Sequence, residues 1–178
     1  NWSAAVHRLS PPAMPKFCLK LKATLENVAK MEAAPENQWS LMVQSPDGSE
    51  TCEAYVSTDE EMELDGSKGT AHFIKKWQGD NKQSYLKIID GNVKKQKLSR
   101  LGMSEDDSQE WVGIVCFECR GMEPIGYTPK NDFAVETTGG TIFDCEDVEF
   151  DEGMWADYDG ENDMSVSIQD LEIQFETF

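Results

Sequence analysis

Apolar and polar residues alternate along much of this chain with the two-residue period of a β-strand. In residues 17–25 every second side chain is apolar, and Lys20, Lys22 and Thr24 occupy positions between them. Successive side chains of a strand point to opposite faces, so this stretch predicts a half-buried strand. Similar apolar runs predict further strands at 38–44, 51–57, 70–77, 84–90, 111–119, 139–150 and 165–175.

No stretch of the sequence carries the sustained apolar stripe, with a period of 3.6 residues, that an amphipathic helix needs. Two segments between the predicted strands have turn composition instead, "SPDG" at 45–48 and "QGDNKQ" at 78–83. Proline presets φ, aspartate and asparagine tolerate turn geometry, and glycine accepts positive φ. We therefore expect an all-β fold of short antiparallel strands.

The order of these segments predicts two related β-rich lobes in an elongated monomer. Residues 14–90 form the predicted N-terminal lobe, residues 91–110 a polar connector, and residues 111–178 the C-terminal lobe. The relation between the lobes rests on a short echo, because "LENV" at 25–28 and "MEPI" at 122–125 each follow a long strand pattern.

The charge of the chain excludes two classes of partner from our expectations. Sixteen basic residues stand against 34 acidic residues, which gives a formal net charge of −18. Such a surface repels phosphate backbones and anionic lipid headgroups, so we expect neither nucleic acid nor a membrane as partner. A basic partner and a merely solubilising acidic surface are both consistent with this charge.

The cysteines indicate a reducing compartment. The chain has five of them, and residues 1–13 contain no apolar core of a secretory signal. We expect residues 1–13 to be a leader or an added extension that contributes nothing to a fold beginning at Met14. No run of residues is long and apolar enough to span a membrane. Free thiols and a cytoplasmic location are therefore expected.

Cys116 and Cys119 have the spacing of a zinc knuckle or a redox dithiol, but they fall inside the strongest strand pattern. Residues three apart on a strand point to opposite faces, whereas a knuckle needs a turn that brings both sulfurs to one point. A redox pair needs a helix N-terminus that lowers the thiol pKa, and none is indicated nearby. We interpret the two residues as separate, half-buried strand cysteines.

The sequence indicates no catalytic motif. His72 is the one histidine of the predicted domain, since His7 lies in the leader, and no nucleophile elbow, P-loop or dinucleotide fingerprint is present. Residues 157–164 resemble a calcium loop, but their glycine falls at position four where an EF-hand requires it at position six. We interpret this segment as a solvated acidic turn. A hydrolase that uses a carboxylate pair stays open, because so many acidic residues supply such pairs everywhere.

Three motifs, in this order along the chain, carry a resemblance to a known family. They are "LKLKATLENV" at 19–28, "FECRGMEPIGYTP" at 117–129 and "MWADYD" at 154–159. Together they resemble the eukaryotic CXXC-motif-containing zinc-binding proteins, over about Met14 to Phe178. The resemblance implies an all-β monomer of two lobes with one structural zinc, held by four cysteines in two CxxC knuckles of the N-terminal lobe.

The positions that match these zinc ligands hold no cysteine in this chain. The first pair falls on Ser45 and Gly48, and the second on Trp77 and Asp80. Glycine has no side chain, an indole offers no lone pair, and only the aspartate is a usual zinc ligand. A structural zinc contributes about 10–16 kcal/mol in small peptides. Our hypothesis is that self-closing turns replace it, together with a buried Trp77 that contributes about 4–6 kcal/mol.

An alternative keeps a metal through other ligands. Cys52, His72 and Asp80 lie near the knuckle positions in sequence and could together bind zinc or copper. Against this alternative, Cys52 and His72 fall in strand patterns, where a half-buried thiol and imidazole are ordinary. We therefore expect no cofactor, with zinc as the exception that this alternative leaves open.

The motif residues that resemble the family have two interpretations. Arg120, Glu123 and Pro124 follow the strongest strand and could form an exposed recognition surface, although an internal Arg120–Glu123 ion pair that pins the lobes together is preferred. Trp155 and Tyr158 are expected to bury their rings and anchor the acidic loop to the domain.

These observations favour a non-catalytic module that binds another protein and has lost the family's zinc. We expect no enzyme, because no catalytic machinery accompanies the scaffold. The alternative function is a zinc- or copper-handling protein that uses the noncanonical ligands named above.

Overall fold

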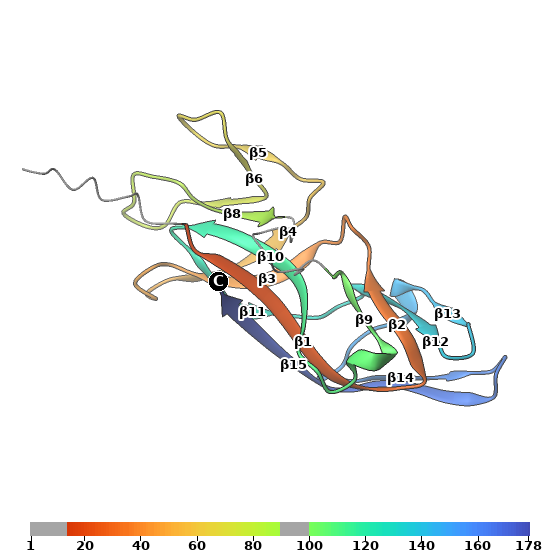
Figure 1. Cartoon of the computed structure of the whole chain (residues 1–178). Helices are drawn as coiled ribbons and strands as arrows, with labels where there is room; N and C mark the ends of the chain where they lie inside the picture. Colours follow the sequence, from red (N-terminus) through yellow and green to blue (C-terminus); the bar gives the residue numbers. More distant parts are fainter. Residues whose placement is uncertain (1–13, 90–99) are drawn as a thin grey trace, which may run out of the picture.

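The computed structural model describes residues 14–89 and 100–178, and these residues form an all-β fold, as the sequence predicts. Figure 1 shows an elongated molecule, with β5 and β6 near one end and the hairpin of β14 and β15 at the other. Residues 1–13, the predicted leader, lie outside the described residues, as do residues 90–99.

A six-stranded antiparallel sheet runs through the middle of the molecule in the order β14-β15-β1-β10-β8-β7 (Figure 1). Its strands are β1 (Lys16–Glu26), β7 (Phe73–Lys75), β8 (Ser84–Ile89), β10 (Val112–Arg120), β14 (Trp155–Asp159) and β15 (Met164–Thr177). The long strands β1 and β15 pair along almost their whole length, from Phe17 opposite Thr177 to Glu26 opposite Ser167. The termini of the predicted domain are therefore joined through backbone pairing.

Three smaller sheets complete the fold. Their orders are β11-β3-β4, β13-β12-β2-β9 and β5-β6. The strands are β2 (Val28–Ala33), β3 (Trp39–Gln44), β4 (Thr51–Val56), β5 (Met62–Glu63), β6 (Thr70–Ala71), β9 (Gly102–Ser104), β11 (Glu123–Tyr127), β12 (Phe133–Thr137) and β13 (Ile142–Phe143). Two single-turn 3-10 helices, η1 (Glu105–Asp107) and η2 (Cys145–Asp147), lie between strands.

The alternating apolar positions of the sequence meet in one hydrophobic core. In β1, Leu19, Leu21 and Ala23 are almost completely buried, as the pattern of residues 17–25 predicts. The core is continuous across the sheets, because the buried Trp39 of β3 contacts the ring of Phe133 in β12. Burial of this kind is the main favourable term in folding, and it holds the sheets together without helices.

Most of the predicted strands are present. The segment 139–150 is an exception, because only Ile142 and Phe143 are in a strand and the remainder turns through η2. The sequence also did not indicate β2, β11, β12 and β14 as strands of their own. The "LENV" segment contains the bend at Asn27 (φ 54°), where β1 turns into β2, whereas "MEPI" follows the bend at Gly121 (φ 70°) and lies mostly in β11, so the two segments do not occupy equivalent positions.

The three larger sheets do not follow the predicted lobe boundaries along the chain. Each of them combines strands from residues 14–90 with strands from residues 111–178. The division of the chain into lobes at residues 14–90 and 111–178 therefore stays a prediction. The predicted connector, 91–110, is not a plain linker in its described part, because Gly102–Ser104 forms β9 and pairs with β2.

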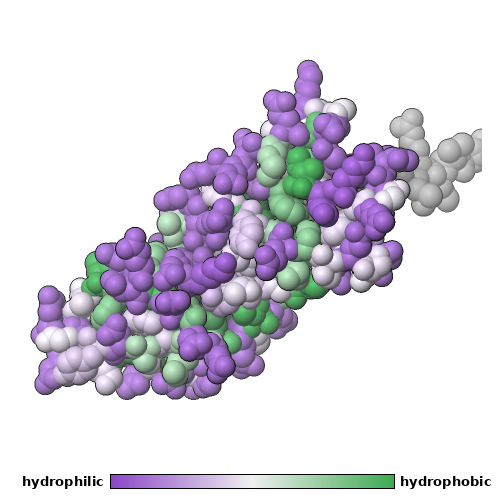
Figure 2. Space-filling model, turned by 180° about the vertical axis from the view of Figure 1, so that it is seen from behind, coloured by the Kyte–Doolittle hydropathy of each residue, from purple (hydrophilic) through white to green (hydrophobic). Residues whose placement is uncertain are grey.

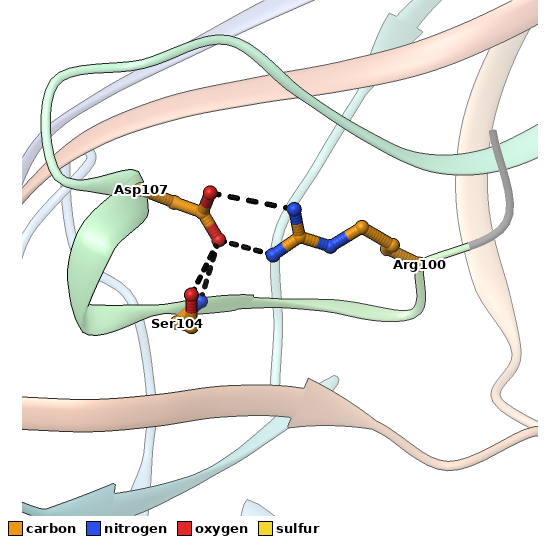
Figure 3. A network of polar contacts seen from close by, with 3 residues as sticks. All are labelled: Arg100, Ser104 and Asp107. Carbon is orange, nitrogen blue, oxygen red and sulfur yellow. Dashed lines mark hydrogen bonds and ion pairs between the residues drawn. The ribbon is translucent and has the colours of Figure 1, made fainter. Parts of the chain in front are cut away.

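The turn after β9 is held by a small polar network (Figure 3). The carboxylate of Asp107 accepts hydrogen bonds from the backbone N–H of Ser104 at 2.8 Å and from its hydroxyl at 2.9 Å. The guanidinium of Arg100 forms an ion pair with the same carboxylate. This arginine is therefore already neutralised within its own segment.

The surface of the molecule is dominated by hydrophilic side chains. Figure 2 shows them over most of the visible face, with smaller apolar areas between them. Exposed apolar side chains are nevertheless present, among them Tyr55, Ile125, Ile142, Met154 and Tyr158. Within the described residues, no helix is long and apolar enough to cross a membrane.

Candidate functional site

The two pairs of positions that match the zinc knuckles lie in β-turns closed by the backbone. In the first turn, the N–H of Gly48 donates to the carbonyl of Ser45 at 2.9 Å. The hairpin is closed again by the N–H of Ser45, which donates to the carbonyl of Glu50 at 2.9 Å. Gly48 has φ 72°, a conformation that glycine adopts without strain. Backbone hydrogen bonds therefore close this turn.

Asp47 organises the first turn from within. Its carboxylate accepts hydrogen bonds from the N–H of Ser49 at 2.9 Å and from the Ser45 hydroxyl at 2.7 Å. The Ser49 N–H and the serine hydroxyls hold the pKa of Asp47 at about 2, because they stabilise the charged form. The hydroxyl of Ser45 also accepts the N–H of Glu50 at 3.1 Å. The buried Ser45 side chain is thus committed to this turn.

The second turn is closed in the same way. The N–H of Asp80 donates to the carbonyl of Trp77 at 3.1 Å, and Gly79 has φ 82°. The two turns are also connected to each other, because the N–H of Gln78 donates to the carboxylate of Glu50 at 3.2 Å. A hydrogen bond to a charged acceptor is stronger than one between neutral groups.

The indole of Trp77 fills the region beside these turns. Its side chain is 3% exposed, and its Nε1–H donates to the carbonyl of Gly121 at 2.7 Å. The ammonium of Lys75 lies 5.8 Å from the centroid of the ring. The buried ring therefore connects the second turn to the bend between β10 and β11, and the burial of Trp77 itself is as predicted.

The residues at these positions do not fit a zinc ion. Ser45 is occupied by hydrogen bonds, Gly48 has no ligand atom, and the one N–H of the Trp77 indole is a donor that already has its acceptor. Asp80 alone could ligate, whereas a structural zinc site uses four ligands. No mechanism through a metal follows from this arrangement.

The alternative ligand set, Cys52, His72 and Asp80, is not brought together either. Among residues 14–89 and 100–178 no three histidine, cysteine, aspartate or glutamate side chains lie where they could share a metal. The Nδ1 of His72 accepts the N–H of Ile88 at 2.9 Å, and burial lowers the pKa of His72. Burial raises the pKa of Cys52, which opposes the thiolate that metals prefer. The imidazole is therefore a structural acceptor.

Cys116 and Cys119 both lie in β10, as predicted, and neither forms a disulfide. They are 1% and 0% exposed, so the expectation of half-buried thiols was wrong and both belong to the core. In the sheet, Cys116 lies opposite Cys18 of β1, and Cys119 lies opposite Leu86 of β8. Burial raises the pKa of Cys119 to about 12. The pair does not form a chelating or redox centre.

The predicted Arg120–Glu123 ion pair is absent from the ion pairs that the structure records among its described residues. Glu123 accepts a hydrogen bond from the side-chain amide of Gln44 instead, across the pairing of β11 with β3. Arg120, at the end of β10, is exposed. Pro124 is buried in β11 and has a packing role.

Trp155 and Tyr158 behave differently from each other. Trp155 is 5% exposed, donates its indole N–H to the carbonyl of Asp147 at 3.0 Å and contacts the ring of Phe143. It anchors β14 as expected. Tyr158 is 52% exposed, with its hydroxyl bound to Asp163, so the expected burial of its ring was wrong. The two residues point to opposite faces of the strand because they are three apart.

The acidic turn at 157–164 contains a buried carboxylate that the sequence did not indicate. Asp159 accepts hydrogen bonds from Thr137 at 2.7 Å, from Thr141 at 2.8 Å and from the amide of Asn162 at 2.8 Å. Burial raises the pKa of Asp159, but these donors outweigh it and hold the value at about 2. The interpretation of a fully solvated turn was wrong at this residue. Thr137 and Thr141 are distant in sequence, so no local signal pointed to them.

The chain is similar to known proteins over most of its length. The family model described as "CXXC motif containing zinc binding protein, eukaryotic" matches residues 18–176. The CXXC motif containing zinc binding proteins of Rattus norvegicus and Homo sapiens are 31% and 30% identical over 166 residues, which cover 91% of this chain and 98% of each relative. The UPF0587 protein v1g245604 of Nematostella vectensis is 28% identical over 165 residues, with the same coverage.

Two solved structures share the fold over nearly their full length. "Hypothetical protein from plasmodium falciparum" superposes with a TM-score of 0.78 at 31% identity, covering 90% of this chain and 99% of that one. "Crystal Structure of C1orf123" superposes with a TM-score of 0.77 at 29% identity, covering 92% and 99%.

Proposed function

Because the chain belongs to the eukaryotic family of CXXC motif containing zinc binding proteins, we propose that it is a non-catalytic, metal-independent module that binds another protein. The observation that carries the binding proposal is the edge strand β14. Among the described residues its only partner strand is β15, and Tyr158 in the strand and Met154 just before it are exposed to solvent. An exposed edge of this kind is a template for pairing with a strand of another chain.

The two ends of β14 are buried and its middle is exposed. Trp155 and Asp159 are buried on the inner face, where they fix the strand to the domain. Ala156, Asp157 and Tyr158 between them are exposed, and so is Met154, which precedes the strand; Met154 is 49% exposed and Tyr158 52%. The strand is therefore held at its two ends, while Met154 and Tyr158 offer apolar contacts.

The charge around β14 selects the kind of partner. Residues 131–178 contain no lysine, arginine or histidine, and the exposed Asp151, Glu152 and Asp157 lie in or beside the strand. A basic segment in extended conformation is complementary to this edge in charge, in backbone hydrogen bonding and in apolar contact. We propose that the partner is a protein with such a segment, and neither a nucleic acid nor a membrane.

The state of the nucleophiles supports a non-catalytic role. Burial raises the pKa of Cys52, Cys119 and Cys145, so these thiols are protonated and weakly nucleophilic near neutral pH. The imidazole of His72, which a catalytic serine or cysteine would need as its base, is buried and accepts a backbone N–H.

Metal independence is supported by the backbone-closed turns and by the buried indole of Trp77. The unpaired state of all five cysteines supports a reducing compartment, which we take to be the cytoplasm. The formal charge of −18 favours a monomer, since copies of the chain repel one another.

A variant-controlled capture experiment tests the binding proposal. The full chain is immobilised and exposed to nuclease-treated lysate of the source cell, beside the double variant Met154→Ser/Tyr158→Ser. The matched control is Met62→Ser/Tyr55→Ser, which removes a methionine and a tyrosine elsewhere that are 37% and 44% exposed. We expect a basic protein that the wild type and the control retain, that the double variant loses, and that rising salt releases.

Three outcomes would overturn the proposal. Retention that is equal in the two double variants would show that β14 is not the binding edge. A retained protein without a basic segment would contradict the charge argument, and the absence of any specifically retained protein would contradict the binding role itself.

A further inference from the structure

Three cationic side chains line one surface hollow in a chain that is otherwise strongly acidic. The hollow has a volume of about 370 Å³, and Lys76, Lys82 and Arg120 lie on its wall together with one carboxylate, Asp65. We call this group the cationic hollow. Its volume is within the range of sites that hold a small ligand.

The walls of the cationic hollow come from elements that are fixed to one another. Arg120 ends β10 and lies opposite Tyr85 of β8, while Lys76 follows β7 and Lys82 precedes β8. The side-chain carbonyl of Gln83 accepts the N–H of Asp65 at 2.8 Å, which holds the neighbouring loop at the rim. Arg120 therefore joins Lys76 and Lys82 because of the fold, although it is distant from them in sequence.

Other cations of the chain are already neutralised by acidic neighbours. Lys20 pairs with Glu176, Lys22 with Glu172 and Lys30 with Glu32. Arg100 pairs with Asp107, as Figure 3 shows. The three cations of the hollow take part in none of the ion pairs that the structure records for residues 14–89 and 100–178.

The cationic hollow is open to a ligand. Lys76, Lys82 and Arg120 are all exposed. A neighbouring hollow of about 440 Å³ shares Lys82 and Arg120, so these two side chains can be reached from both spaces. The side-chain amides of Asn81 and Gln83 line both hollows and provide further hydrogen-bond donors.

We propose that the cationic hollow binds an oxyanion of the phosphate type. The guanidinium of Arg120 presents parallel N–H donors that match two oxygens of a phosphate, and the lysines supply point charges around it. In an acidic chain, a cluster of cations without recorded acidic partners attracts anions that the rest of the surface repels. This site contains no residue of β14. Arg120 does not pair with Glu123 in the structure, so its guanidinium can bind the anion.

Titration of the full chain with inorganic phosphate, followed by backbone amide NMR at constant ionic strength, tests the site. We expect saturable shifts at residues 81–85 and at Arg120, which sodium chloride does not reproduce. A second titration with glycerol 3-phosphate distinguishes the source of the anion. Tighter binding of the ester assigns the site to a phosphoryl group on a larger molecule, and tighter binding of inorganic phosphate assigns it to the free ion.

Single charge removals locate the effect. Arg120→Gln should weaken phosphate binding about tenfold or more, because it removes a charge-assisted hydrogen-bonding group. Lys82→Gln should weaken it in the same direction and keeps the test available if Arg120→Gln does not fold. Lys130→Gln, an exposed lysine that does not line the hollow, should leave binding unchanged. Equal effects of the three variants, or shifts that chloride reproduces, would overturn the proposal.

Discussion

The indole Nε1–H of Trp77 donates a hydrogen bond of 2.7 Å to the backbone carbonyl of Gly121, 44 residues further along the chain. The sequence resemblance assigns Trp77 to a zinc-ligand position of the family, and Gly121 lies in the bend between β10 and β11. The bond therefore connects the turn at Trp77–Asp80 to the end of a central strand. Burial of the ring and satisfaction of its polar tip occur in the same contact.

Truncation of this side chain tests its structural role. Trp77→Ala should lower the free energy of unfolding by about 3–5 kcal/mol, because it removes a buried ring and leaves a cavity. Trp77→Phe should lower it by about 1–3 kcal/mol, because the Gly121 carbonyl then loses its donor while most of the apolar contact remains. Urea denaturation followed by circular dichroism measures both values.

The control for Trp77 is another tryptophan. Trp111 is 40% exposed, with Lys22 above its ring, so Trp111→Ala should change stability by about 1 kcal/mol or less. Comparable losses for Trp77→Ala and Trp111→Ala would mean that the buried indole does not hold the turns together.

Removal of metal gives the second prediction. If the turns at Ser45–Gly48 and Trp77–Asp80 close without an ion, dialysis against a strong chelator should leave the thermal midpoint unchanged. Protein purified without chelator should contain less than stoichiometric zinc by element analysis. Removal of a structural zinc would lower the thermal midpoint strongly, because its loss removes about 10–16 kcal/mol of apparent binding free energy in small peptides. Stoichiometric zinc with a lower midpoint after dialysis would refute the metal-free account.

The fold was predictable where periodicity is strong. The strict alternation in residues 17–25 identifies β1, and the apolar run at 111–119 identifies β10. Local rules failed for β11, since Pro124 and Gly126 are poor strand residues, yet the strand pairs with β3 across an irregular register. Tertiary pairing overrides local preference there.

Some features of the candidate sites were also predictable from local sequence, whereas others depend on tertiary pairing. The turns at the knuckle positions were readable from residue types, because proline, aspartate and glycine have fixed backbone preferences. The cationic hollow was not, because Arg120 reaches Lys76 and Lys82 only through the pairing of β8 with β10. The ion pair expected between Arg120 and Glu123 failed for a related reason, since β3 brings Gln44 against the glutamate.

A third prediction concerns Gly102 in the edge strand β9. A Cβ atom added at this glycine would lie 2.0 Å from the carbonyl oxygen of Met31 and 2.8 Å from the Cα of Glu32, which is closer than real contacts allow. Gly102→Ala should therefore separate β9 from β2 and destabilise the protein by about 1–3 kcal/mol or more. At Gly160 an added Cβ meets nothing within 4 Å, so Gly160→Ala should have an effect within about 0.5 kcal/mol. A tolerated alanine at 102, measured by the same denaturation, would contradict the close approach of β9 to β2.

The fourth prediction uses the reactivity of the five thiols. Cys18, Cys116 and Cys119 are at most 1% exposed, whereas Cys52 and Cys145 are partly accessible. An aromatic disulfide reagent should therefore label two thiols in the native protein and all five in denaturant. Labelling should be slow at neutral pH, because burial raises the pKa of both Cys52 and Cys145. Rapid labelling of three or more native thiols would show that the core strands β1 and β10 open readily.

The last prediction concerns the acid stability that Asp159 confers. The pKa of this carboxyl is about 2 in the folded protein and 3.8 for an unperturbed aspartate, so its contribution to stability is complete above about pH 4. As the pH falls, the unfolded chain takes up the proton first, and the contribution is lost between about pH 4 and pH 2. Asp159→Asn should therefore be less stable than the wild type at pH 7 and lose less stability over this window, as measured by urea denaturation at each pH. Asp144→Asn, at an exposed position without a recorded side-chain hydrogen bond, should keep the wild-type slope. An unchanged slope in Asp159→Asn would show that Thr137, Thr141 and Asn162 do not stabilise the ionised carboxylate.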